Sequence, residues 1–291
     1  MIKEIHFFTV IYLITLLDLK GQNADKEQQH LLSDELHEIS GLITLDRGQH
    51  YYAINDGGNE AAIYQLDSVG RVERKVSVVN AINRDWEELT TDGKEYLYIA
   101  DTGNNKQKRH RVVIYIIRLT DLTDQNAVQA DSIEIIYQKY PDKKPKGKDR
   151  KFDVEAMCWM KDKIYFFTKN WMQDISQKTD LYSLYPKPGM HNLSPEKSIA
   201  YSGRFFMESQ LTGSCFDQES NYIYWLTETQ IIQTDAPSFK RKMMVAYDLP
   251  ELGQWESICP LGNSRFAVAR ERNKIFNQEA ALMIVTLKTK D

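Results

Sequence analysis

The chain is poor in cysteine and carries no strong charge of either sign. Its 291 residues contain three cysteines and no C-x-x-C. An odd number of cysteines cannot form a complete disulfide framework, and a thiolate zinc site has no support. The formal net charge of −4 is too small to predict nucleic-acid binding or attraction to an anionic membrane. One basic run, "KKPKGKDRK" at 143–151, is either a phosphate-binding patch or a solvated loop, and its proline and glycine favour the loop.

Common catalytic signatures are also missing. The sequence has no G-x-S-x-G, no H-E-x-x-H and no G-x-x-x-x-G-K-[ST], which removes the serine-hydrolase elbow, the zincin helix and the P-loop. His37 could act as a general base, because its ordinary pKa is about 6.5. A lone histidine is more often a hydrogen-bonding surface group, so His37 is only a candidate catalytic residue.

The longest apolar run lies at the N-terminus. The run "FFTVIYLITLL" at 7–17 has no charged residue, but a bilayer span needs about 20 residues. It suits the apolar core of a signal peptide covering 1–22. The alternatives are a buried segment or an uncleaved anchor. We therefore expect export to the periplasm or the exterior, and a single mature domain at 23–291 without a membrane span.

What the sequence does contain is a repeated six-residue motif. The five copies are "EISGLI", "DWEELT", "DVEAMC", "QLTGSC" and "QWESIC", beginning at residues 38, 85, 153, 210 and 254. The second position is always apolar, and all three cysteines fall in the sixth position. This column predicts that the cysteines are small buried residues at equivalent packing sites. Trp86 and Trp255 share the second position and are expected to pack between neighbouring repeats.

The spacing and strand pattern of the repeat predict a β-propeller. The copies recur every 44 to 68 residues, and periods near 40–50 residues are typical of propellers or solenoids. Each motif is followed by short alternating strands with turn residues between them, which favours four-stranded propeller blades. We expect an all-β fold of five blades, or six if 125–150 holds another. Because the last repeat stops after three strands, a segment near 29–36 is expected to close the ring.

Polar residues are expected to gather at one mouth of the central channel. The starts of inner strands and the ends of second strands share one face of a propeller. The second-strand ends carry Asp56, Asp101, Lys169, Glu228 and Arg270. Two loops that follow, "DGGN" and "DTGN", match each other, and their glycines suit positive φ.

Carboxylate and amide oxygens are the ligands that Ca²⁺ prefers, with about six to eight per ion. The alternative is that these acids accept backbone N–H bonds or pair with Lys169 and Arg270. We therefore predict a calcium site among a set of acidic and amide side chains on this mouth: Asp85, Glu87, Asp101, Asn104, Asp153, Glu155 and Glu256. The remaining rim residues are expected to bind a ligand: Asp56, Lys169, Glu228 and Arg270.

The motifs over residues 36–105 resemble a known bacterial family. "HEISGL", "YYAINDGGN" and "DWEELTTDGKEYLYIADTGNN" are similar to the SdiA-regulated proteins and to the wider phytase-like and esterase-like propellers. The resemblance implies a calcium-binding exported propeller. It also implies that Glu87 and Asp101 match acidic positions near a phosphate-ester cleft, with Glu155 as their repeat equivalent. The dense lysine and arginine cluster that phytases need is not evident here.

Three functions remain open from the sequence. The first is a calcium-stabilised module that binds a small molecule or a protein at the channel mouth, most simply as a monomer. The second is a calcium-dependent hydrolase of phosphate or carboxylic esters, with Glu155 as the candidate base. The third is a propeller without a metal.

Overall fold

The computed structural model describes residues 22–147, 150–169, 176–202, 208, 210–236, 238–240 and 243–288. The expected signal peptide at 1–22 lies outside the described residues except for Gln22, which begins the first strand. Among the described residues, the helices are too short or too polar to cross a bilayer.

The fold is a β-propeller, as the repeat predicted. The strands pair in five antiparallel four-stranded units, which we number in chain order and list from the inside outward. Unit 1 comprises β2 (Ile39–Ile43), β3 (His50–Asn55), β4 (Ala62–Asp67) and β5 (Val72–Val78). Unit 2 comprises β6 (Trp86–Thr91), β7 (Tyr96–Asp101), β8 (Arg111–Arg118) and β10 (Asp131–Tyr137). Unit 3 comprises β11 (Val154–Met160), β12 (Lys163–Thr168), β13 (Ser176–Leu184) and β15 (Lys197–Ser202).

Units 4 and 5 are joined into one eight-stranded sheet. Unit 4 comprises β16 (Leu211–Asp217), β17 (Tyr222–Thr227), β18 (Gln230–Asp235) and β19 (Val245–Asp248). Unit 5 comprises β20 (Trp255–Gly262), β21 (Arg265–Arg270), β22 (Ala281–Leu287) and the N-terminal strand β1 (Gln22–Leu31). β1 runs antiparallel to β22 and also pairs parallel with β19. The N-terminal strand therefore closes the ring, as expected.

The closing strand begins earlier than the sequence suggested. The expected segment was 29–36, but Ser33 caps the short 3-10 helix η1 (Asp34–Leu36) by accepting a bond from Glu35 N, and the strand ends at Leu31. The strand is hard to recognise because it lies at the periphery. Its sequence "QNADKEQQHL" is mostly polar, and Ala24 alone among its residues is fully buried.

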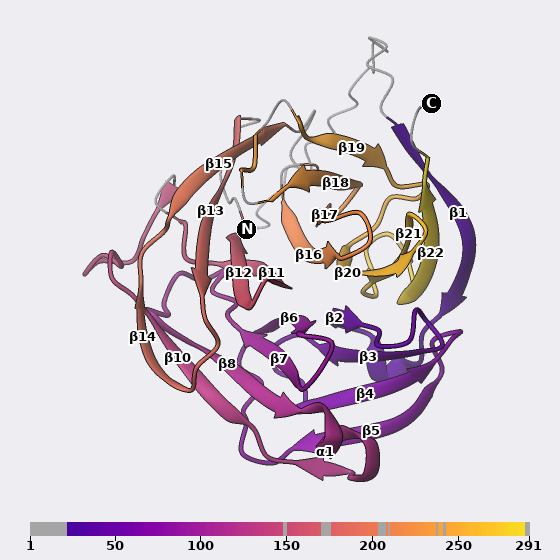
Figure 1. Cartoon of the computed structure of the whole chain (residues 1–291), viewed down its shortest axis with the longest axis horizontal. Coiled ribbons are helices and arrows are strands. Elements are labelled where there is room, and N and C mark those ends of the chain that lie inside the picture. The colour runs from indigo at the N-terminus through magenta and orange to yellow at the C-terminus, as the bar shows by residue number, and fades with distance from the viewer. Residues whose placement is uncertain are drawn as a thin grey trace, which may run out of the picture.

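The innermost strands form a closed ring around the channel. β2 contacts β6, which contacts β11, followed by β16 and β20, and β20 returns to β2. Figure 1 shows these five strands nearest the centre, with the other strands of each unit outside them. The segment 125–150, where a sixth blade was considered, instead supplies β9 (Ala127–Val128) to the edge of β5 and β10 to unit 2.

The apolar columns of the motif fill the spaces between units. Trp86 is fully buried with Ile54 of unit 1 and Leu97 of unit 2, and Trp255 is buried with Leu226 and Phe266. Both tryptophans therefore pack between neighbouring units, as predicted. All three cysteines are buried and free, which confirms their predicted packing role. Two further elements lie outside this pattern: β14 (Gly189–Leu193), which extends unit 2 beside β10, and helix α1 (Leu119–Asp124).

Candidate functional site

Every inner strand bulges at the third position of the motif. In each of the five pairings the register shifts between the second and fourth motif residues. A β-bulge leaves one residue unpaired and changes the direction of its side chain. The residues in this position are Ser40, Glu87, Glu155, Thr212 and Glu256. In all five units, the bulge therefore leaves the third-position residue outside the pairing between the first and second strands.

The residue type at the third position determines which contacts its side chain makes. Ser40 donates a hydrogen bond from Oγ to the Trp86 carbonyl at 2.9 Å, and Thr212 donates to the Trp255 carbonyl at 2.5 Å. In both cases a hydroxyl ties one unit to the next. An ionised glutamate cannot donate such a bond. Glutamate at this position therefore contributes charge to the channel mouth instead of a tie between units.

The residue that follows the second strand of each unit also lies at the mouth. Asp56 N and Lys169 N donate to the carbonyls of Glu38 and Asp153, and Glu271 N donates to Gln254. Counting from the strand pairings, the five equivalent residues are Asp56, Thr102, Lys169, Glu228 and Glu271. Two of them contact the following unit: Asp56 lies within 4.8 Å of Asp85 and Glu87, and Thr102 Oγ1 donates to the Val154 carbonyl at 2.8 Å.

Two of the expected residues do end their second strands, but they are not equivalent to the other three. Asp101 and Arg270 pair directly with the second motif residues Trp86 and Trp255, so they lie one position before Asp56, Lys169 and Glu228. A one-residue difference in a strand turns a side chain to the opposite face. Arg270 accordingly pairs with Glu251 at 3.1 Å and lies over the Trp255 ring, away from the acidic residues at the mouth.

Glu271 lies at the mouth but is not among the residues that the sequence predicted there. Burial raises its pKa to about 7, and the charges of Asp56 and Glu38 act in the same direction. The pairing of the second strands with the motif places Glu271 at the position equivalent to Asp56 and Lys169. Without that register, the sequence pattern points to the neighbouring Arg270.

Three carboxylates converge at the junction of units 1 and 2. Asp56, Asp85 and Glu87 each offer an oxygen, and these atoms all lie within 4.8 Å of one another. Burial is the largest cause that raises the pKa of each, to about 7 for Asp56, and neighbouring carboxylates add to it. We call these three residues the acidic triad. Among the described residues, no lysine or arginine forms an ion pair with any of them.

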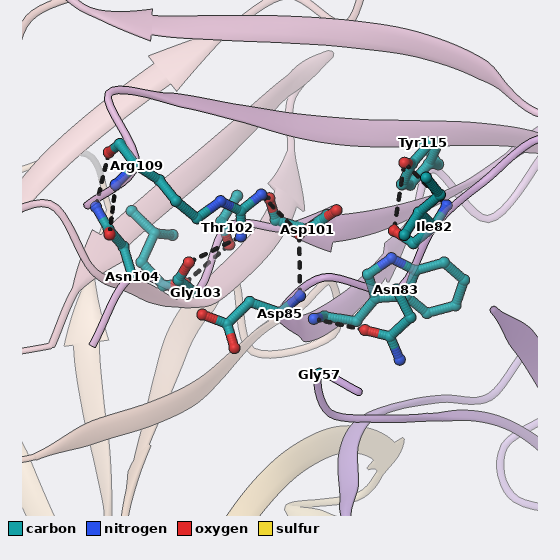
Figure 2. A network of polar contacts seen from close by, with 12 residues as sticks. Gly57, Ile82, Asn83, Asp85, Asp101, Thr102, Gly103, Asn104, Arg109 and Tyr115 are labelled. Carbon is teal, nitrogen blue, oxygen red and sulfur yellow. Dashed lines mark hydrogen bonds and ion pairs between the residues drawn. The ribbon is translucent and has the colours of Figure 1, made fainter. Parts of the chain in front are cut away.

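Two glycines leave room for the acidic triad. A Cβ at Gly103 would lie 2.0 Å from Glu87 Oε1 and 2.7 Å from Asp85 Oδ2, and a Cβ at Gly57 would lie 2.8 Å from Asp85 Oδ1. These glycines belong to the matching "DGGN" and "DTGN" loops. They are required for close approach, whereas Gly58 is the one with a positive φ, of 88°. Figure 2 shows Gly57 and Gly103 on either side of Asp85.

Neighbouring polar residues hold the acidic triad in place. Asn83 donates to the carbonyls of Asn55 and Asp56 and accepts from Trp86 N, which joins the two units. Asp85 N donates to Asp101 Oδ1 at 3.2 Å, and Gly103 N donates to the Asp85 carbonyl at 3.1 Å. The Asp85 carboxylate offers an oxygen within 4.8 Å of an oxygen of each of the other two acids.

Asp101 and Asn104, both expected as metal ligands, hold the loop that carries Gly103. Asp101 Oδ1 pairs with Arg109 at 2.7 Å. The Asn104 amide donates to the carbonyls of Arg109 and Phe152, and its oxygen accepts from two backbone N–H groups. Figure 2 shows Asn104 and Arg109 joined by dashed lines close to Gly103. Asp153, likewise expected as a ligand, accepts a bond from Asn104 N.

The residue after the second strand of unit 3 is a lysine. Lys169 Nζ lies 3.1 Å from Glu155 Oε2, with both side chains largely buried. Burial raises the pKa of Glu256 and Glu228, and the charge of Lys169 opposes the rise in both. His37, the candidate base, is well exposed and its Nδ1 donates to the Asp34 carbonyl at 2.9 Å.

The mouth therefore contains three close carboxylates and, beside Glu155, the ammonium of Lys169. Crowded carboxylates repel one another unless a positive charge lies between them. Oxygen ligands without a nearby histidine or thiolate suit a hard ion such as Ca²⁺.

The comparisons with known proteins support the fold and leave the activity open. No family model and no curated protein matches the sequence. An aldose sugar dehydrogenase from Streptomyces coelicolor, solved with PQQ bound, aligns with 91% of this chain and 98% of its own, at 10% identity and a TM-score of 0.50. A gluconolactonase from Xanthomonas campestris aligns with 92% and 97% of the two chains, at 8% identity and a TM-score of 0.42. The Swd1 propeller domain from Myceliophteria thermophila aligns with 92% and 100%, at 9% identity and a TM-score of 0.43.

Proposed function

We propose that the protein is an exported, calcium-binding β-propeller that holds a ligand or a partner protein at its acidic channel mouth. The observation that carries the proposal is the acidic triad of Asp56, Asp85 and Glu87, whose oxygens lie within 4.8 Å of one another. Three carboxylates so close are costly to ionise together, and a divalent cation offsets that cost. The apolar run at 7–17 supports export.

The local structure fits calcium better than other metals. All three candidate ligands are carboxylates, and Gly57 and Gly103 leave the space beside them free of side chains. Calcium accepts irregular sets of oxygen ligands, whereas zinc and copper favour histidine or cysteine. When bound, calcium would hold the starts of units 1 and 2 together and present positive charge at the mouth.

The resemblance to the SdiA-regulated and phytase-like propellers supports the same proposal. Glu87, the residue matched to an acidic position of that superfamily, belongs to the acidic triad. Asp101, the second matched residue, supports the loop next to it through Arg109.

A calcium-dependent hydrolase is the second candidate. The observation that favours it is positive charge beside the acidic triad, because Arg109 and Lys106 both lower the pKa of Asp85 against the effect of burial. Basic groups next to a bound calcium suit an anionic ester. Glu155 remains the candidate base, and its Oε2 lies 3.1 Å from Lys169 Nζ.

Calcium binding is tested by melting the protein in chelator and in added calcium. We expect calcium at about 100 times its Kd to raise the melting temperature by about 5–10 °C. Asp85→Asn should abolish the rise, because it removes one charge of the acidic triad. Glu134→Gln is the matched control, since Glu134 is an exposed carboxylate on β10 paired with Arg111. Identical melts in chelator and in calcium would contradict the proposal.

The two candidate functions separate in an activity assay. A panel of phosphate and carboxylic esters is given to the wild type, to Asp85→Asn and to Glu155→Gln. Turnover that both substitutions lower at least 100-fold would establish the hydrolase. A calcium-binding protein with no turnover would support the binding module.

A further inference from the structure

The second mouth of the channel, on the face opposite the acidic triad, contains a cavity of about 290 Å³. Its lining comes from the ends of the inner strands β2, β6, β11, β16 and β20 and from the turns that follow three of them. Glu88 lies in β6 between Glu87 of the acidic triad and Thr90 of the cavity, and it bonds to β16 across the ring. The cavity is therefore separate from the candidate calcium site.

The walls of the cavity are partly apolar. Leu45 is 45% exposed, and Trp159, Phe216 and Pro260 are each partly exposed. The Trp159 ring is fixed by stacking on Tyr98, with centroids 5.6 Å apart and planes 5° from parallel. Partly exposed apolar side chains around a hollow are typical of a small-molecule site. These walls suit a ligand with an apolar body.

Two opposite charges meet at the rim of the cavity without pairing. A Cβ at Gly262 would lie 2.9 Å from Glu219 Oε2 and 3.4 Å from Arg47 Nη1, so both side chains end beside this glycine. Within the described part of the chain, the Arg47 guanidinium makes no hydrogen bond or ion pair. The Glu219 carboxylate accepts one bond, from Asn263 N at 3.2 Å. Both charged groups therefore have unused hydrogen-bonding capacity.

Other polar groups of the lining are engaged within the protein. Asp217, the remaining charged residue of the lining, accepts backbone bonds from Glu219 N and Ser220 N with its two oxygens. Thr90 Oγ1 accepts from Trp159 N at 2.9 Å. Arg47 and Glu219 are thus the charged groups of the cavity that remain open to a ligand.

From these contacts we infer that the second mouth binds a small zwitterion, namely an α-amino acid with an apolar side chain. The forked N–H donors of Arg47 match the carboxylate of the amino acid, and Glu219 accepts from its ammonium. A ligand that carries both charges on one carbon satisfies two groups that do not pair with each other. Small-molecule pockets begin at about 300 Å³, so the cavity suits a molecule of this size. The inference goes beyond the proposed function and does not depend on calcium.

The test is isothermal titration of the wild-type protein with leucine and three analogues. The compound 4-methylpentanoate lacks the ammonium, 3-methylbutylamine lacks the carboxylate, and glycine lacks the apolar body. We expect leucine to bind and each analogue to bind at least 10-fold more weakly, because each leaves one part of the cavity unsatisfied. Leucine affinity should be the same in chelator and in calcium, since Glu88 separates the two sites.

Two substitutions assign the charges. Arg47→Gln and Glu219→Gln should each weaken leucine binding at least 10-fold. Arg47→Gln should not weaken 3-methylbutylamine, which has no carboxylate, and Glu219→Gln should not weaken 4-methylpentanoate, which has no ammonium. This crossed pattern distinguishes lost contacts from a disturbed fold. Arg71→Gln, at an exposed arginine after β4, is the matched control and should bind leucine like the wild type.

Three results would overturn the inference. A wild type that does not bind leucine removes the site and leaves the calcium proposal as it stands. Equal affinity for leucine and 4-methylpentanoate removes the role of Glu219. Leucine binding that requires calcium places the amino acid at the acidic mouth instead of the second mouth.

Discussion

At the scale of single residues, close approach of the backbone matters as much as charge. The acidic triad exists because two loops present glycine where any side chain would meet a carboxylate. Gly103 illustrates this, since its φ lies outside the positive region and the space beside it is filled by Glu87 and Asp85. The acids define the charge of the site, and the glycines let the carboxylates share one space.

Gly103→Ala tests this requirement directly. The added methyl would overlap Glu87 Oε1 and displace the Asp85 carboxylate. We expect calcium affinity to fall at least 10-fold, as measured by isothermal titration, because the three oxygens can no longer converge. Gly147→Asn is the control: Gly147 has a φ of 52° with open space around it, a conformation that asparagine tolerates. Equal calcium affinity in the two variants would show that binding does not require glycine at position 103.

At the scale of elements, strands from other parts of the chain cover the outer edges of several units. β9 extends unit 1, β14 extends unit 2, and β1 lies between β19 and β22. An open strand edge is a template for pairing with other chains. These three strands cover edges that would otherwise be exposed, and β1 also joins the first part of the chain to the last.

The contribution of β1 can be measured with a buried charge. Ala24 on this strand is 3% exposed and packs with Tyr224 and Val285. Ala24→Asp should lower the free energy of unfolding by about 2–5 kcal/mol, because a carboxylate would be buried without a partner. Gln28→Asp, at an exposed position of the same strand, is expected to cost less than about 0.5 kcal/mol. Urea unfolding of both variants gives the comparison, and equal losses would show that β1 is not packed as described.

At the scale of the whole molecule, one glutamate joins units that are not neighbours. Glu88 on β6 of unit 2 accepts a hydrogen bond from Ser214 N on β16 of unit 4 at 3.0 Å, and a second from Leu89 N. The side chain is 1% exposed, and burial raises its pKa well above the ordinary range. The Glu88 side chain therefore links β6 to β16 across the ring, and Figure 1 shows these two strands on different sides of the centre.

Glu88 predicts a pH dependence of stability. Because its pKa is higher in the folded protein than in the unfolded chain, its contribution is fully present below the unfolded pKa. That contribution is lost as pH rises towards the folded value. We expect the free energy of unfolding of Glu88→Gln, relative to the wild type, to improve by about 1–2 kcal/mol between pH 4 and pH 8. Chemical unfolding at both values measures this. If the difference in unfolding free energy between Glu88→Gln and the wild type stays constant with pH, the raised pKa of Glu88 is contradicted.

Much of the architecture follows from the sequence alone. The apolar second position, the cysteine column and the turn residues are local patterns, and local patterns determine strands, their burial and their repetition. They predicted the propeller, the burial of Trp86 and Trp255, and the gathering of acids at one mouth. The matching "DGGN" and "DTGN" loops also drew attention to the segments that surround Asp85.

The tertiary structure decided which acids meet and which are compensated. A single position of register separates Glu271, at the mouth, from Arg270, which faces Glu251, and a bulge turns Glu87 out of its ladder. Register and bulges depend on pairing between strands, which local patterns do not fix. The ion pair of Glu155 with Lys169 and the reach of Glu88 across the ring depend on distances between segments far apart in the chain. For the same reason, composition could not reveal the polar strand β1, whose place comes from the edges it covers.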